Sequence, residues 1–550
     1  MDFARTLESL RKRFGTAVAP LSLPIGSEDN FVGVVDLLTH KAYKWENGKI
    51  APTEIPADMQ DRISSMREEL IDSVAGMDDA LMEKYFEEGT LSDEEIAKGL
   101  EIGVRTGKVV PVLCGSAMKM IGVDTLMDFI VASVPSPASV PPVKGTNPSG
   151  GEEVRKPDDP FCALVFKTMA DPYVGKLTYF RVFSGSVKSD SHIYNANKER
   201  EERVGQVYFI QGKNQEPTAE VGAGDIGAVA KLSETTTGDT LCDKSKPIIL
   251  KPIEFPEPVY SLAVRAKTKA DEDKLGPALQ KLSEEDPSFR TYRDPSTGQT
   301  LMSGLGETHL DVVVERLKRK FGVEVETELP KVAYRETITK TAEAQGRHKK
   351  QTGGRGQFGD CWIRLEPLPR GAGYEFVDAI VGGAIPRQFI PSVDKGIREA
   401  MSGGILAGYP VVDVKATCYD GSYHTVDSSD MAFQLAGRLA FRAAAEKAGP
   451  VLLEPIMDLE VIVPEEFMGD VIGDLNAKRG RVVGMEPIGG GKQKIRAQVP
   501  QAEILRYSID LRSIARGRGK FTAKFSHYEE VPAHVAQAVI AEAEKARKEE

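Results

Sequence analysis

One order of strands and helices is indicated twice in this chain, in residues 260–325 and again in residues 457–528. Each copy starts with an apolar strand and continues with a helix, two strands, a second helix and a final strand. The helices expected from this pattern are 270–284 and 309–320 in the first copy and 465–478 and 503–514 in the second. The order βαββαβ is that of the split βαβ module, which encloses a core of its own. Two copies predict a multi-domain chain rather than a protein built around a single catalytic pocket.

The first 134 residues read as alternating α and β structure. Apolar strands are expected at 20–25 and 109–114, and a helix opens at Gly122. Between the two strands, residues 56–102 are predicted to be helical. Residues 51–100 carry 14 acidic against 4 basic side chains, which indicates either a solvated helical face or a docking surface for a basic partner.

Three segments complete the chain. Residues 134–142 are so rich in proline that they are expected to be a linker. Residues 160–252 show short strands separated by glycine and aspartate turns, which predicts a small β-barrel. Residues 331–452 form a separate α/β segment between the two repeated modules.

The most unusual stretch of the sequence is 345–357, QGRHKKQTGGRGQ. It contains four glycines and four Lys or Arg side chains, and no acid occurs between Glu343 and Asp360. Glycines let a backbone come close to another chain, and the cations can screen phosphates, so the stretch indicates either RNA contact or a solvated loop. The net charge of -11 argues against a general nucleic-acid coat, so any such contact must be concentrated.

Several chemistries are not indicated by the sequence. The five cysteines are at least 48 residues apart, which excludes a Cys-x-x-Cys site and favours a reducing, cytoplasmic compartment. The histidines show no zinc-binding spacing, and Gly-x-Ser-x-Gly and the P-loop pattern Gly-x-x-x-x-Gly-Lys-Ser/Thr are both absent. No apolar stretch approaches the roughly 18 residues that a membrane span requires. We therefore expect no catalytic residue, no metal site and no membrane contact.

Four strings resemble the elongation factor G family of translational GTPases, and the resemblance covers nearly the whole chain. They are QTGGRGQFG at 351–359, YDGSYHTVDSS at 419–429, LEPIM at 453–457 and GDVIGDL at 469–475. The resemblance implies a multi-domain α/β and β fold with five domains. These would be the C-terminal remainder of a GTPase-like α/β domain at 1–140 with an acidic helical insertion at about 40–105, a β-barrel at 150–255, a ferredoxin-like split βαβ domain at 257–330, an elongated RNA-facing α/β domain at 331–452, and a second ferredoxin-like domain at 453–540 with a C-terminal helix.

For the nucleotide, the resemblance implies that the family's P-loop, switches and Asn-Lys-x-Asp motif would precede residue 1. Only Gly115 to Lys119 are similar to a guanine-contacting loop, so Ser116 and Ala117 are the candidate cofactor contacts. GTP and Mg²⁺ belong to the complete family member. This chain alone is expected to bind neither and to be inactive as a GTPase.

For partners, the resemblance implies the ribosome, with the acidic insertion docking the stalk protein and residues 331–452 reaching rRNA and the tRNA–mRNA pair in the decoding centre. The expected RNA contacts are Lys349, Lys350, Gly353, Gly354, Arg355, Gly356, Gln357, His424 and Asp427. In this interpretation Asp427 orients His424, which can donate from either ring nitrogen, and Gly421 permits the tight path of the loop. The implied function is GTP-dependent translocation of tRNA and mRNA, or ribosome recycling.

Three positions depart from the family pattern: Asp360, Lys188 to Asp190, and Gln501 to Arg506. Asp360 is expected to add an acid beside the first loop. These departures leave open a divergent paralogue, of the recycling or the ribosomal-protection type. The absence of a P-loop leaves open a second alternative, a nucleotide-independent ribosome-binding module.

Overall fold

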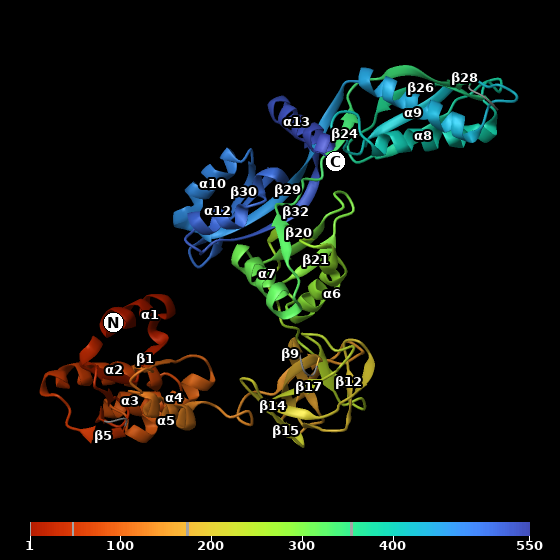
Figure 1. Cartoon of the computed structure of the whole chain (residues 1–550). Helices are drawn as coiled ribbons and strands as arrows, with labels where there is room; N and C mark the ends of the chain where they lie inside the picture. Colours follow the sequence, from red (N-terminus) through yellow and green to blue (C-terminus); the bar gives the residue numbers. More distant parts are fainter. Residues whose placement is uncertain (1, 47–48, 172–174, 352–355, 550) are drawn as a thin grey trace. The chain divides into compact units, whose positions relative to one another are not determined.

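The chain divides into two compact units, Met1–Ile253 and Glu254–Glu550, and each is described by itself. The computed structural model describes residues 2–46, 49–171, 175–351 and 356–549 (Figure 1). None of the described helices is both long enough and apolar enough to cross a membrane.

Residues 3–133 combine helices with two separate small sheets. The elements are α1 (Phe3–Phe14), β1 (Val18–Pro20), β2 (Ser22–Ile25), β3 (Gly33–Asp36), β4 (Lys41–Glu46), β5 (Lys49–Thr53), α2 (Gln60–Ala75), α3 (Asp79–Glu88), α4 (Asp93–Arg105), β6 (Val110–Val112) and α5 (Val123–Ser133). β1 and β6 pair in parallel, and β2 to β5 form an antiparallel sheet in chain order. Leu23, Leu70 and Leu100 are fully buried in the core that the helices share with the sheets.

The strand expected at 20–25 is two strands, and the break falls at Leu21. The N–H of Leu21 donates to the carbonyl of Val112 beside β6, whereas its carbonyl accepts from the N–H of Leu37 beyond β3. The insertion expected to be helical over about 40–105 also differs, because it begins with the hairpin β4–β5 and becomes helical only from Gln60.

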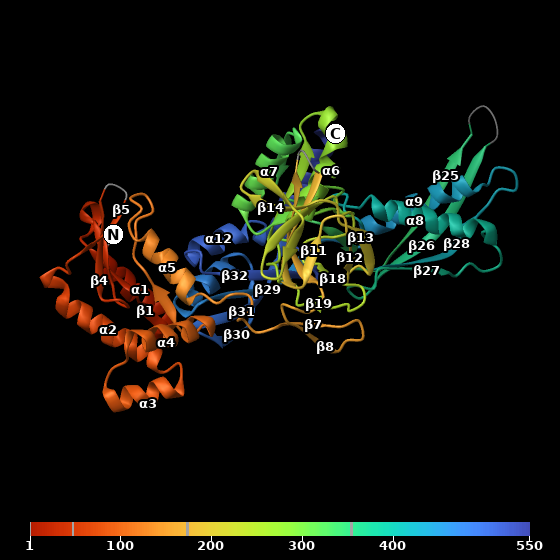
Figure 2. The ribbon, with the colours of Figure 1, turned by 90° about the horizontal axis from the view of Figure 1, so that it is seen from below.

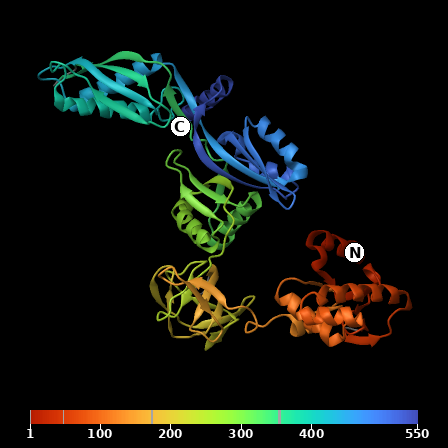
Figure 3. The same ribbon diagram turned by 180° about the vertical axis from the view of Figure 1, so that it is seen from behind.

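The described residues of 143–250 form only strands and turns. The strands are β7 (Val143–Thr146), β8 (Glu152–Arg155), β9 (Cys162–Asp171), β10 (Gly175–Ser184), β11 (Ser186–Lys188), β12 (His192–Asn195), β13 (Arg200–Arg203), β14 (Val207–Gln211), β15 (Asn214–Thr218), β16 (Glu220–Gly222), β17 (Ile226–Ala230), β18 (Thr240–Cys242) and β19 (Ile249–Leu250). Eight of them form one sheet in the order β13-β12-β18-β9-β10-β17-β14-β15. Its strands are strongly curved (Figure 3). The core that they enclose includes Val165, Phe180 and Val207.

Both repeated modules are present in the second unit. The first module, residues 260–328, is β20 (Tyr260–Ala266), α6 (Lys269–Glu285), β21 (Arg290–Arg293), β22 (Thr300–Gly304), α7 (Glu307–Phe321) and β23 (Val325–Glu328). The second module, residues 450–530, is β29 (Pro450–Pro464), α10 (Met468–Ala477), β30 (Arg481–Gly489), β31 (Lys492–Pro500), α11 (Gln501–Ile504), α12 (Tyr507–Ile514) and β32 (Lys520–Glu530), followed by α13 (Ala533–Glu549). Their strand orders, β21-β22-β20-β23 and β30-β31-β29-β32, are equivalent.

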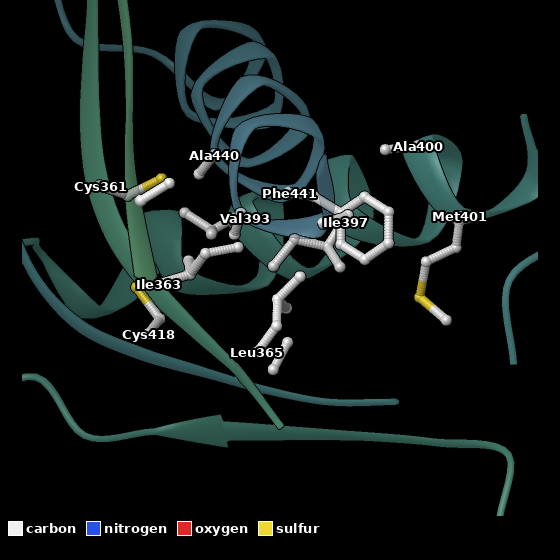
Figure 4. Packing of buried hydrophobic residues seen from close by; sticks show 14 of the residues in the cluster. Cys361, Ile363, Leu365, Val393, Ile397, Ala400, Met401, Cys418, Ala440 and Phe441 are labelled. Carbon is white, nitrogen blue, oxygen red and sulfur yellow. The ribbon is translucent and has the colours of Figure 1, made fainter. Parts of the chain in front are cut away.

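Between the modules lies the central region, residues 335–447. It comprises β24 (Arg335–Ile338), β25 (Ala342–Lys350), β26 (Gln357–Pro367), β27 (Tyr374–Asp378), α8 (Ile390–Ser402), β28 (Val414–Ser422) and α9 (Asp430–Lys447). β25, β26, β28 and β27 form one sheet in that order, whereas β24 joins the sheet of the second module through β29. Helices α8 and α9 lie side by side on the sheet (Figure 2). Ile363, Val393 and Phe441 belong to the fully buried core between these layers (Figure 4).

Helix α9 lies unusually close to its neighbours because glycines face it. A Cβ atom on Gly346 would lie 2.0 Å from the carbonyl oxygen of Ala436, and one on Gly359 would lie 2.4 Å from that of Ala432. On the α8 side, a Cβ on Gly396 would lie 2.0 Å from the carbonyl oxygen of Gln434. Since real Cβ atoms do not approach an oxygen so closely, these positions accept only glycine without displacement of α9.

Candidate functional site

Two segments meet at one end of the central region. One is the start of β26 with the preceding Gly356, and the other is the 423–429 loop between β28 and α9. The N–H of Phe358 donates to the carbonyl of Asp427 at 2.8 Å, and Ser428 Oγ donates to the carbonyl of Phe358 at 2.9 Å. A Cβ atom on Gly356 would lie 2.8 Å from the Asp427 carboxylate, so the backbone at Gly356 is in close contact with the Asp427 side chain. The structure therefore brings together Gly356 and Asp427, which the sequence placed in separate strings.

His424 is held from one side by its own loop. Its Nδ1 accepts from the backbone N–H groups of Val426 at 3.3 Å and Asp427 at 3.1 Å. Asp427 Oδ2 lies 3.2 Å from the same nitrogen. The histidine side chain is 54% exposed. Two backbone N–H groups and the Asp427 carboxylate enclose Nδ1, so Nε2 is the ring nitrogen left to meet another molecule.

Lys349 and Lys350 are exposed at the end of β25, opposite Phe358 and Gln357 of β26. Within the described residues, no carboxylate forms an ion pair with either lysine, so both charges are available to another molecule. Gln357 Oε1 lies 2.9 Å from Nε2 of His348. The other three expected contacts, Gly353, Gly354 and Arg355, lie outside the described residues.

Arg347 belongs to the same face and was not among the expected contacts. Its guanidinium lies 5.5 Å from the centre of the Phe358 ring, a cation–π contact that leaves the charge beside both loops. Its place two residues before the lysine pair was the available signal. The register of β25 and β26 pairs Phe358 with Lys349 and Arg347 with Asp360, so the contact of Arg347 with the Phe358 ring is a diagonal one that the sequence does not reveal.

Asp360 does not add an exposed acid beside the first loop, contrary to expectation. Its side chain is buried, and it accepts from Gln345 Nε2 at 2.8 Å and from Ser422 Oγ at 2.7 Å. These hydrogen bonds join β25, β26 and β28, so Asp360 fastens the strands that carry both loops. Gly421 is likewise part of β28, where a Cβ atom would lie 2.4 Å from the carbonyl oxygen of Asp360. Gly421 therefore allows β26 and β28 to lie close together, and it is not part of a turn.

Ser116 borders a cavity of about 770 Å³ that is also lined by Asp2, Arg62 and Lys119. The N–H of Ser116 donates to the carbonyl of Ile121, so this amide is already engaged. The N–H of Ala117 has no acceptor within the part of the chain that the structure describes, but Ala117 does not line the cavity. Asp2 was not expected here; its position at the N-cap of α1 was the only sequence signal.

These residues fit one side of a nucleotide base at most. The sequence carries no Gly-x-x-x-x-Gly-Lys-Ser/Thr loop to surround phosphates and hold Mg²⁺. Across the described residues, no three His, Cys, Asp or Glu side chains are grouped as metal ligands. The residues present do not fit a complete GTP and Mg²⁺ site, and no step of GTP hydrolysis follows from them.

The acidic helices carry an apolar side chain that the charge count does not reveal. Phe86 on α3 is 79% exposed, and the exposed carboxylates Glu83 and Glu87 flank it. Lys84 points elsewhere, because its Nζ donates to Glu95 Oε1 of α4 at 2.6 Å. That bond and those from the Ser92 N–H and hydroxyl lower the pKa of Glu95 to about 2. The face around Phe86 is therefore both acidic and apolar.

Comparison with known families accounts for most of the chain from residue 160 onward. Residues 160–244 match the model of elongation factor G domain 2, and residues 255–329 match domain III. Residues 330–449 match domain IV, and residues 451–539 match the elongation factor G C-terminus. The chain belongs to the elongation factor G family. Membership places it among translation elongation factors and implies an interaction with the ribosome.

A solved structure extends the similarity to the first 159 residues. A crystal structure of a protein from Thermus thermophilus is 40% identical in sequence and has a TM-score of 0.78. The match covers 99% of this chain and 79% of that chain. Similarity to the Thermus protein therefore includes the region that contains Ser116 and the acidic helices.

Proposed function

We propose that this chain acts as the ribosome-facing body of an elongation factor G that moves tRNA and mRNA in a GTP-dependent reaction at cytoplasmic ribosomes, and that it also serves in ribosome recycling. The five domains and two ferredoxin-like modules expected from the sequence are part of this proposal. The observation that carries it is the contact between the two loops at the end of the central region, where Gly356 lies against Asp427. This contact presents Lys349, Lys350 and His424 Nε2 together.

The chemistry of that end suits RNA. Exposed lysines without carboxylate partners among the described residues can replace the counterions of phosphates, and an Nε2–H can donate to a ribose or phosphate oxygen. His424 is not a proton-transfer group in this proposal, since movement of tRNA breaks no bond there. Its ring is fixed in orientation because its Nδ1 is already occupied.

A salt series of ribosome binding tests the RNA contact. The Lys349→Ala/Lys350→Ala variant should bind ribosomes more weakly, and the slope of log affinity against log salt should fall by about two if both lysines contact phosphates. A matched control is Lys340→Ala/Lys447→Ala, which removes the same charge from exposed positions at the opposite end of the region. Equal slopes in the two variants would show that the loop lysines are merely solvated.

We further propose that these 550 residues alone neither bind GTP tightly nor hydrolyse it. The support is the missing phosphate-binding motif together with the engaged amide of Ser116. Isothermal titration with GTP and phosphate release on ribosomes should both give no signal above buffer. Micromolar binding by the purified chain would overturn this part.

The acidic and apolar face on α3 is the proposed docking site for the ribosomal stalk protein. Phe86→Ser should weaken binding to isolated stalk protein, while Phe14→Ser, which changes another exposed phenylalanine, should not. Equal affinities of both variants and the unmodified chain in a titration would place the stalk contact elsewhere.

A further inference from the structure

Cys162 of β9 and Cys242 of β18 lie directly opposite each other on neighbouring antiparallel strands. The hydrogen bonds show which kind of pair they form. The N–H of Asp243 donates to the carbonyl of Phe161, and the N–H of Val165 donates to the carbonyl of Asp239. Hydrogen-bonded and non-hydrogen-bonded pairs alternate along an antiparallel ladder, so the intervening pair of Cys162 and Cys242 is non-hydrogen-bonded.

This is the pair geometry in which opposite side chains lie closest. Cα atoms of a non-hydrogen-bonded pair are about 4.5 Å apart. A disulfide needs Cα atoms roughly 4.4 to 6.8 Å apart, so the two residues can be bridged without moving the strands. Both are free thiols, fully buried, and packed in one cluster with Ile248 and Leu250.

The other two buried cysteines provide a contrast within the same chain. Cys361 of β26 pairs with Gly421, and Cys418 of β28 pairs with Ile363 across a register shift (Figure 4). Both are as buried as the first pair. They share a core but are not opposite each other. They therefore serve as a control pair that is equally buried but is not aligned across two strands.

The surroundings of Cys242 favour it as the first thiol to react. Burial raises the pKa of both thiols, that of Cys162 to about 12, but a backbone N–H of Ile248 limits the rise at Cys242. The buried guanidinium of Arg155 lowers the pKa of both, and its Nε has no hydrogen-bond partner among the described residues. Cys242 also borders a cavity of about 300 Å³, which gives a small oxidant a place beside the strand.

We propose that Cys162 and Cys242 are a redox modification site at which a peroxide converts the two thiols to an intrachain disulfide. The Cys242 thiolate attacks one peroxide oxygen, the O–O bond breaks, and a sulfenic acid and hydroxide form. The Cys162 sulfur then attacks the sulfenic sulfur and releases its oxygen as water. In sum, two thiols and one hydrogen peroxide give one disulfide and two waters. This site is independent of the proposed ribosomal function.

The disulfide would tie the short strand β18 to β9 and close residues 162–242 into a covalent loop. A cross-link of that span restricts the unfolded chain, so it should protect the all-β part of the first unit against unfolding. The expected shift of its thermal unfolding is on the order of 10 °C upward, and dithiothreitol should reverse it.

Peptide mapping of the oxidised full chain tests the proposal. Fully reduced protein is treated with hydrogen peroxide, quenched with catalase, unfolded in N-ethylmaleimide and digested. We expect Cys162 and Cys242 in one joined peptide, about 2 Da lighter than the two free-thiol peptides together, with Cys361 and Cys418 alkylated. Cys361→Ser should keep the joined peptide, and Cys162→Ser should abolish both it and the thermal shift.

Two results would overturn the proposal. In the first, the peroxide has oxidised Cys114, the less buried thiol, and yet N-ethylmaleimide alkylates Cys162 and Cys242 to the same extent as Cys361 and Cys418. In the second, the peptide map shows a disulfide that joins Cys114 to Cys162 or to Cys242. If Cys162→Ser is unstable, Cys242→Ala gives the same reading, because it removes the partner sulfur without adding a polar group.

Discussion

The first and second modules have the same order of elements but are built to different lengths. The opening strand β20 has 7 residues, whereas its counterpart β29 has 15. The closing strands β23 and β32 have 4 and 11 residues. The additional length of β29 pairs with β24, the strand that leads into the central region. One βαββαβ pattern therefore yields a module with short strands in one place and the base of another region in the other.

The polar contacts that secure the two modules differ in kind. In the first module, His309 Nε2 lies 3.1 Å from Asp286 Oδ2, and the N–H of Leu305 donates to His309 Nδ1. In the second, Arg479 donates to both oxygens of Glu454 at 2.6 and 2.9 Å and to Glu503 at 2.8 Å. Glu454 is 2% exposed. The second module thus relies on an arginine shared by two carboxylates, and the first on a histidine–aspartate contact and a separate lysine–glutamate pair.

Removal of Arg479 should have the largest effect. Arg479→Ala leaves the Glu454 carboxylate buried without its partner, which costs about 4 kcal/mol in the free energy of unfolding. Urea denaturation followed by hydrogen exchange should localise the loss to residues 450–530. In the first module, Lys320→Ala removes a single donor from Glu285 and should cost less. Glu454→Gln in the Arg479→Ala background should recover part of the loss, and failure to do so would refute the charge-pair explanation.

Equivalent core truncations should differ in how far their effects spread. Leu279 of α6 and Leu475 of α10 are both buried, and truncation of either to alanine should cost about 3 kcal/mol. Leu279→Ala should raise amide exchange only within residues 260–328. Leu475→Ala should raise it in β24 as well, because β29 carries both pairings. Unchanged exchange in β24 would mean that β29 does not transmit instability.

The link between β24 and the central region is tested by Glu336. This residue is fully buried, and its carboxylate accepts four backbone N–H groups, those of Ile405, Leu406, Ala407 and Tyr409. Glu336→Gln turns one acceptor oxygen into a donor that faces two of these N–H groups, so a loss of about 2 kcal/mol is expected. The exposed Glu375→Gln should change the free energy of unfolding by less than about 0.5 kcal/mol. Equal losses of unfolding free energy in the two variants would contradict the role of Glu336 in holding the loop that carries these four N–H groups.

Low pH should produce the smallest effect, through Asp286 of the first module. Burial alone would raise the pKa of Asp286, but hydrogen bonds from Ser288 and the contact with His309 outweigh it and lower the pKa below its usual range. A lowered carboxyl pKa stabilises the fold above the unfolded value near 4, and that contribution is lost as pH falls through the lower folded pKa. Asp286→Asn should therefore cost under about 1 kcal/mol at pH 7 and less at pH 2. Urea titrations at the two pH values measure this, and an equal cost at both would exclude the carboxylate as its source.

Periodicity was sufficient for the long amphipathic helices and insufficient for short strands. The expected helices 270–284 and 309–320 correspond to α6 and α7 within two residues at each end. The helix expected over 503–514 is divided into α11 and α12. The strand over 20–25 is divided at Leu21 because its two halves have different partners, which a local pattern does not contain.

The candidate site shows the same limit. Charge and glycine content were sufficient to predict that Lys349 and Lys350 are exposed, since lysine side chains usually are. The contact of Gly356 with Asp427 and the burial of Asp360 depend on strand register between segments far apart in the sequence. The orientation of the His424 ring depends on two backbone N–H groups whose direction is set by the loop path. Residue types alone determine none of these.

The glycine contacts around α9 have a mechanical consequence. A layered body bends when its layers slide past one another, and sliding needs side chains that can change rotamer at the interface. At Gly346, Gly359 and Gly396 the interface is backbone against backbone, so there is no rotamer to change. Sliding of α9 against its neighbours is therefore opposed directly by backbone contact. The central region should therefore behave as a rigid body. A displacement imposed where β24 meets β29 would move Lys350 and His424 by a similar distance.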